Sequence, residues 1–178
     1  FFDLEDGWAV RGGSKHYIKN RGINDVRHVF NIEMVGMGRN LIVWPSREDD
    51  LRTGWLNFLT RHASDLGFKT HSIPTPEVAL VSFPTRLGFM SDHVSFHHAG
   101  FTRACSLTTF PEGDLEYFRQ FKNGKFGLSL AYAIVRYRLL KTGSVPKLFQ
   151  HYHNSEDRSE FIEEENLNDM TELVWRIT

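Results

Sequence analysis

Residues His151 to Asp157 read H-Y-H-N-S-E-D, which places imidazole, phenol and carboxylate groups together just before a final amphipathic helix. Three other stretches carry side chains of the same kinds: F-F-D-L-E-D at residues 1–6, N-I-E-M-V-G at residues 31–36 and S-D-H-V-S-F at residues 91–96. Each stretch alone is a weak signal. Together they predict the ligand loops of one metal site, brought together from distant parts of the chain.

The composition is that of an ordinary soluble globular domain. The 178 residues are 40% apolar and 24% charged, with a net charge of −1, which predicts a single domain over residues 1–178. The small net charge gives no broad electrostatic bias toward nucleic acid or an anionic membrane. Cys105 is the only cysteine, so an intrachain disulfide and a thiolate metal cluster are both excluded. No apolar run approaches the ~18 residues of a membrane-spanning helix.

The order of strand and helix patterns predicts an α/β layered fold. Runs of β-branched and aromatic residues predict strands at residues 1–4, 29–35, 41–44, 69–73 and 104–108. The second and third of these form either a hairpin or two neighbouring strands. Helical spacing predicts helices after Ser14, after Pro45, at residues 126–141 and at residues 163–177.

Several details of these elements are also predicted. Ser14 is expected to be the N-cap of the first helix and Gly22 its end. Trp55 and Phe58 are expected to lie in the core rather than in a binding site. Residues 110–123 read as irregular, and the helix at residues 126–141 has a wide apolar face that predicts good burial.

Asp6, Glu33 and His153 supply two oxygen ligands and one nitrogen ligand, a mixture that zinc accepts in catalytic sites with one open position. Glu33 stands in an apolar run, where a carboxylate must be paired, protonated or bound to metal; the alternative is an edge-strand position that faces water. Glu5 stands beside Asp6 and is a candidate general base. The alternative for Glu5 and Asp6 is a solvated pair in a loop.

These residues resemble the zinc exopeptidase family that contains the bacterial and vacuolar aminopeptidases and the glutaminyl cyclases. That family has Phe-x-Gly-Glu-Glu at a strand end, then Asn-x-Asp-Met-Ile-Gly, then Ser-Asp-His-x-x-Phe before Ala-Gly, and finally Tyr-His-Thr-x-x-Asp. The corresponding stretches here are F-D-L-E-D, N-I-E-M-V-G, S-D-H-V-S-F-H-H-A-G and Y-H-N-S-E-D. They follow the same order and cover nearly the whole chain.

The resemblance implies a phosphorylase/hydrolase-like fold with a mixed, mostly parallel central sheet flanked by helices, and a site for two zinc ions. It implies that Glu5 is the general base and that Tyr152 stabilises the oxyanion. The zinc ligands would be Asp6, Glu33 and His153. Residues that support the site or face the substrate would be Asp92, His93 and Asp157.

The chain departs from the family pattern in several ways. Asp6 replaces a Glu and Glu33 replaces an Asp, so each carboxylate changes its reach by one methylene. Residues 110–150 are longer than the corresponding family segment and read as an insertion that could form a wall of the substrate cleft. No His-x-Asp segment, which in the family carries one zinc ligand and the bridging Asp, is present; we therefore expect that the segment lies upstream in a longer enzyme.

The functional expectation is a zinc-dependent exopeptidase of the aminopeptidase type, acting on peptide substrates. One alternative is a glutaminyl cyclase-like acyltransferase, although these enzymes usually carry Trp where this chain has Tyr152. Another is a non-catalytic binding or dimerisation module derived from the same fold. The resemblance makes a secreted or extracytoplasmic location plausible, and a homo-oligomer is possible.

Overall fold

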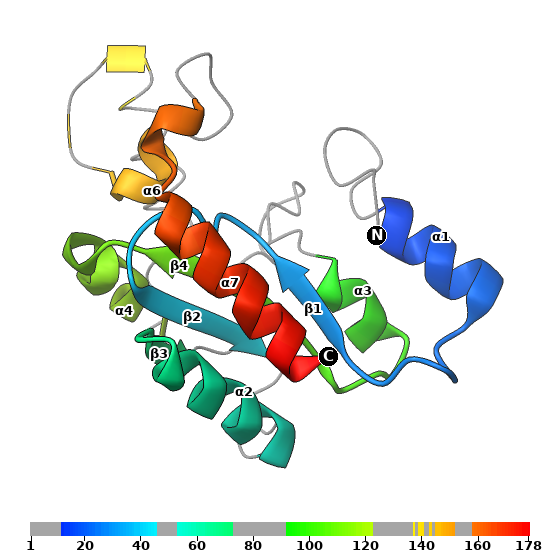
Figure 1. The fold of residues 1–178 in the computed structure, drawn as a ribbon. Coiled ribbons are helices and arrows are strands. Elements are labelled where there is room, and N and C mark those ends of the chain that lie inside the picture. Colours follow the sequence, from blue (N-terminus) through cyan, green and yellow to red (C-terminus); the bar gives the residue numbers. More distant parts are fainter. Residues whose placement is uncertain are drawn as a thin grey trace.

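The computed structural model describes residues 12–45, 53–72, 92–122, 137, 139–140, 143, 145–151 and 158–178. Its centre is a four-stranded sheet in the order β1-β4-β2-β3 (Figure 1). The strands are β1 (Val29–Ile32), β2 (Asn40–Pro45), β3 (Lys69–Ser72) and β4 (Ala104–Phe110). β1 pairs with β4 and β2 with β3 in parallel, while β2 and β4 are antiparallel. The predicted mixed, mostly parallel sheet is therefore confirmed.

The connection between β1 and β2 differs from the prediction. Their separation by β4 means that these strands form neither a hairpin nor an adjacent pair. β1 also ends at Ile32 rather than at Val35, because Met34 adopts a left-handed backbone conformation with φ 50° that turns the chain out of the strand.

Helices flank the sheet and connect its strands. They are α1 (Gly12–Arg21), α2 (Gly54–Asp65), α3 (His93–His98), α4 (Leu115–Lys122), α6 (Lys147–Gln150) and α7 (Glu164–Ile177), with 3₁₀ turns at Glu112–Asp114 and Ser159–Phe161. In Figure 1, α2 and α7 cover the near face of the sheet, and α3 lies behind β1. α7 matches the predicted closing helix to within one residue.

Alternating side chains of β2 divide the core into two clusters, as expected for a strand whose successive residues point to opposite faces. Leu41 and Val43 pack with buried residues of α2 and α7, including Leu59 and Leu173. Ile42 and Trp44 point to the other face and join a cluster whose other members are Phe110, Phe118, Leu148 and Phe149. The sheet is thus covered on both faces, which is typical of an α/β fold.

Two local predictions about the helices were wrong. Ser14 is not an N-cap: α1 begins two residues earlier, and the Ser14 Oγ is fully buried and donates a hydrogen bond to Ser95 Oγ at 2.9 Å. Residues 110–122, the described part of the predicted irregular stretch 110–123, are not irregular. They form the end of β4, a 3₁₀ turn and α4, whose Phe118 is buried against Trp44.

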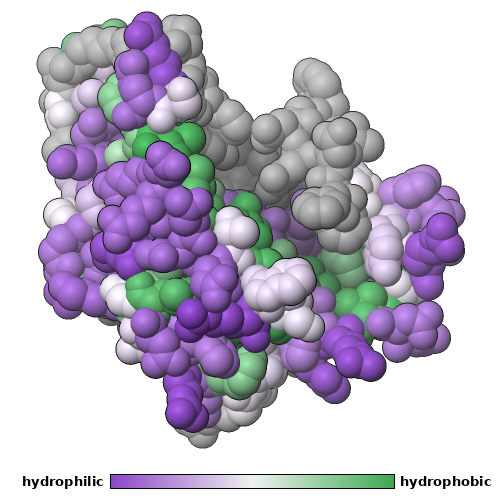
Figure 2. Space-filling view, viewed as in Figure 1, coloured by the Kyte–Doolittle hydropathy of each residue, from purple (hydrophilic) through white to green (hydrophobic). Residues whose placement is uncertain are grey.

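Three aromatic and aliphatic side chains are more exposed than predicted. Trp55 packs against the core as expected, but Phe58 is 50% exposed. Most of residues 126–141 lie outside the described residues; among the described ones, Leu139 and Leu140 are 76% and 66% exposed. Figure 2 shows that the outer surface over α7 is mostly hydrophilic, with small hydrophobic areas between.

Candidate metal centre

Glu33 follows β1 directly, at the carboxyl end of that strand. Its backbone N–H donates to Leu107 O at 2.9 Å and so continues the ladder between β1 and β4 by one residue. The side chain is half-buried, so Glu33 is neither a fully buried carboxylate nor one that faces water freely. It lies just beyond the strand rather than within it. The carboxyl ends of strands in α/β sheets are where ligands commonly bind.

A short polar chain leads from the sheet to the Glu33 carboxylate. Asn31 Nδ2 donates to Ser106 Oγ at 3.3 Å, and Ser106 Oγ donates to Glu33 Oε2 at 3.4 Å. Asn31 and Ser106 stand opposite each other in the β1–β4 register, and Ser106 is buried. The Ser106 hydroxyl therefore holds one Glu33 carboxylate oxygen through a long hydrogen bond.

Asp92 and His93 lie at the beginning of α3, and both are buried. The Asp92 side chain does not cap its own helix. Its buried Oδ1 has no hydrogen-bond partner among the residues that the structure describes. A buried carboxylate oxygen without a donor is costly, which is consistent with a residue that is placed for a ligand rather than for stability.

The remaining predicted site residues lie outside the described residues: Glu5, Asp6, Tyr152, His153 and Asp157. Of all eight predicted site residues, the structure therefore describes only Glu33, Asp92 and His93. Within the described part of the chain, no group of three or more His, Cys, Asp or Glu side chains could hold a metal ion. The proposed ligand set as a whole remains a prediction from the sequence.

The helix α6, which precedes Tyr152 and His153 in the chain, is held by a carboxylate from a distant part of the sequence. The buried Asp114 carboxylate accepts hydrogen bonds from the N–H groups of Lys147 at 3.0 Å and Leu148 at 3.1 Å. Asp114 thus caps the first turn of α6 from a distant part of the chain. His151, at the end of α6, stacks on Phe161 with ring centroids 4.0 Å apart.

The chain after Tyr152 and His153 makes a contact with the loop that follows Glu33. Asn166, in the first turn of α7, donates from Nδ2 to Val35 O and to Thr109 Oγ1, each at 2.9 Å. Sequence reasoning missed Asn166, Ser106 and Asp114, because their partners are far away in the chain. The signal that could have indicated them is a polar residue at a position of a helix or strand where an apolar residue is expected.

A comparison with models of protein families shows which family this chain belongs to. A model described as Peptidase family M28 matches residues 1–178. The chain belongs to peptidase family M28. This result confirms the resemblance to zinc exopeptidases and supports a hydrolase function of the peptidase type. A search of curated proteins and a search of solved structures each returned no match.

Peptidase family M28 is generally zinc-dependent, and a peptidase family implies a peptide substrate. Among the described residues of this peptidase-family chain, none of the helices combines the length and the hydrophobicity of a membrane span.

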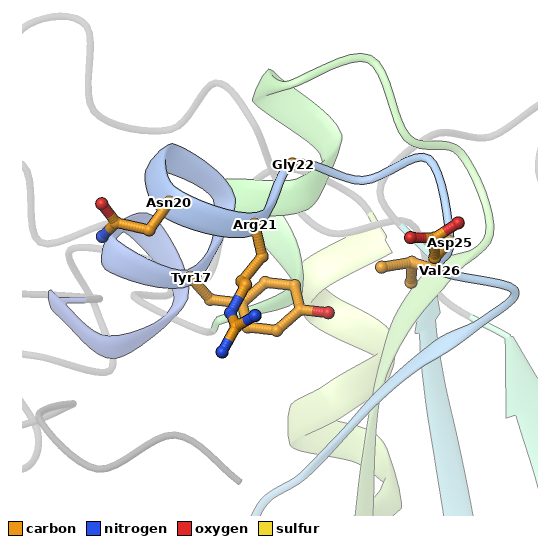
Figure 3. Close-up of a pocket in the computed structure, with 6 residues that line it drawn as sticks. All are labelled: Tyr17, Asn20, Arg21, Gly22, Asp25 and Val26. Carbon is orange, nitrogen blue, oxygen red and sulfur yellow. The ribbon is translucent and has the colours of Figure 1, made fainter.

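An open pocket in this peptidase-family chain lies beside α1. Figure 3 shows that Tyr17 and Arg21 of α1 line it on one side, and that Asp25 and Val26 approach from the turn after the helix. Gly22 ends α1 as predicted, with φ 72°. Of the described site residues, neither Glu33 nor Asp92 nor His93 lines this pocket.

Proposed function

We propose that this chain is a zinc-dependent exopeptidase, of the aminopeptidase type, that releases residues from the N-terminus of peptides. The match of the whole chain to a peptidase family carries this proposal. The place of Glu33 at the carboxyl end of β1 supports it, because the proposed ligand is half-buried and, among the described residues, its carboxylate accepts only a long hydrogen bond from Ser106 Oγ.

The donor chemistry of the proposed site fits zinc. Asp6, Glu33 and His153 would hold the ion through two carboxylates and one imidazole. When bound, zinc would act as a Lewis acid that polarises the scissile carbonyl. A second zinc would need further ligands, because the sequence contains no His-x-Asp segment.

The other residues would act on protons and on the position of the substrate. The Glu5 carboxylate would take a proton from the attacking water and return it to the leaving amine. The Tyr152 hydroxyl would donate a hydrogen bond to the oxyanion. Asp92, whose buried Oδ1 lacks a partner among the described residues, would with His93 support a ligand or face the substrate, and Asp157 would support His153.

Two other functions are tested with this proposal. A glutaminyl cyclase-like acyltransferase would use the same scaffold, but Tyr152 favours the peptidase. A non-catalytic binding module is favoured by the exchanged carboxylates at Asp6 and Glu33, and is disfavoured by the presence of Glu5, Tyr152 and His153. A secreted or extracytoplasmic location belongs to the same proposal, as does one domain with an insertion at residues 110–150.

The first experiment measures zinc per chain together with two activities of the purified protein. Hydrolysis of aminoacyl-p-nitroanilides with bound zinc is the expected result, and cyclisation of an N-terminal glutaminyl peptide would instead identify the acyltransferase. Glu5→Gln should lower kcat at least about 100-fold, the scale of general base catalysis, without loss of zinc. Glu164→Gln, at an exposed position in α7, is the matched control. Absence of both zinc and activity would support the binding module.

A further inference from the structure

The loop after Glu33 has a conformation that requires support from outside. Met34 has φ 50°, a left-handed conformation that costs a non-glycine residue roughly 1–2 kcal/mol. Its carbonyl accepts a hydrogen bond from Thr109 N at 3.3 Å, which ties the turn to β4. The direction in which the Glu33 carboxylate leaves the sheet therefore depends on how the next few residues are held.

Asn166 provides this support from α7. It is 1% exposed, and its Nδ2 donates one hydrogen bond to Val35 O and another to Thr109 Oγ1. Val35 lies two residues after Glu33, and Thr109 is the residue that also binds the Met34 carbonyl. One buried amide thus joins the turn, β4 and α7.

Glu163, just before α7, binds the same loop in two further places. Its backbone N–H donates to Gly36 O at 2.8 Å, and its Oε2 accepts from Gly38 N at 2.9 Å. A Cβ on Gly36 would lie 3.2 Å from the Ile162 side chain. The loop after Glu33 and the start of α7 therefore form one hydrogen-bonded unit.

We propose that Asn166 is a positioning residue for Glu33, and that it sets the affinity of the site for zinc by fixing the loop that follows this ligand. The inference rests on the proposed function, in which Glu33 and His153 bind zinc. Outer residues that orient a metal ligand commonly change metal affinity about 10–100-fold.

The test compares the zinc affinity of the 178-residue chain and its variants, measured by competition with a chromophoric chelator. Asn166→Ala should weaken zinc binding at least about 10-fold. Asn168→Ala, at an exposed position two residues along α7, should change it less than about two-fold. Glu163→Ala removes the bond to Gly38 N from an exposed side chain, and should weaken zinc binding about three-fold even where Asn166→Ala folds poorly.

A purely structural role is separated by a stability control. Leu173→Ala empties a buried position seven residues further along the same helix that makes no hydrogen bond to the loop through its side chain. It should lower the urea midpoint of the metal-free chain without changing zinc affinity more than about two-fold. Affinities are compared where circular dichroism shows each variant folded. Equal losses of affinity in Asn166→Ala and Leu173→Ala would overturn this inference alone. A wild-type chain that binds no zinc would overturn the proposed zinc site, and this inference with it.

Discussion

Asp114 offers a direct measure of how firmly the segment before Tyr152 is held. The residue is 4% exposed, and its carboxylate accepts hydrogen bonds from the N–H groups of Lys147 and Leu148. Asp114→Ala removes two charge-assisted hydrogen bonds, worth roughly 1.5 kcal/mol or more each, and leaves the Leu148 N–H buried without an acceptor. Relief of the desolvated carboxylate offsets part of this loss, so the expected cost is about 2–4 kcal/mol.

Equilibrium unfolding in urea, followed by circular dichroism, measures this free energy of unfolding. Asp114→Asn keeps one acceptor oxygen and should cost about 1–2 kcal/mol. The control is Glu116→Ala, which removes an exposed carboxylate from a 3.7 Å ion pair with Arg119 and should change stability by less than about 0.5 kcal/mol. If Asp114→Ala costs no more than Glu116→Ala, the capping of α6 by Asp114 does not hold this segment in place.

Three further predictions concern stability and reactivity. Gly38→Ala should lower the free energy of unfolding in urea by more than about 2 kcal/mol, because Gly38 has φ 73° and a Cβ would lie 2.3 Å from Phe110 O. In the control Gly54→Ala, the new Cβ meets nothing within 4 Å, so this change should be neutral or stabilising. The pKa of His71 is lowered, first by burial and then by Arg119; the unfolded state therefore binds more protons just below pH 6.5, and stability should fall as the pH drops from 7 toward 5. His71→Gln should flatten that dependence and the exposed His16→Gln should not, so equal pH profiles would contradict this account. Burial raises the pKa of the Cys105 thiol, so an aromatic disulfide reagent should label it only after denaturation, and rapid labelling of the folded chain would refute its burial.

The elements that the sequence predicted well are those whose signal is local. β2 contains the continuous apolar run L-I-V-W, and α7 carries apolar residues at helical spacing. The structure reproduces both elements within two residues. The helix α4 was missed because its short amphipathic run follows a Pro and a Gly. Phe58 was placed in the core because helical spacing identifies a face but not how far that face extends.

The candidate site was predictable as a set of motifs and not as a network. Glu33 was found from its neighbours in sequence, but its supports come from β4 and α7, and Asn166 is separated from Val35 by 131 positions. No pattern within one window of sequence could indicate that contact. The place of β4 between β1 and β2 is likewise a property of long-range pairing.

This strand order also has a consequence for synthesis on the ribosome. β4 is the last of the four described strands to be made, yet it is the one that joins β1 to β2; Asn40 pairs with Phe110, 70 positions later. β2 and β3 can pair early through their α2 crossover, but β1 has no described partner until residues 104–110 emerge. Long-range pairing of this kind slows folding, and it leaves the strand that precedes Glu33 exposed in the nascent chain. Chaperone binding to the growing chain should therefore be strongest before Phe110 leaves the exit tunnel and should decline once β4 inserts.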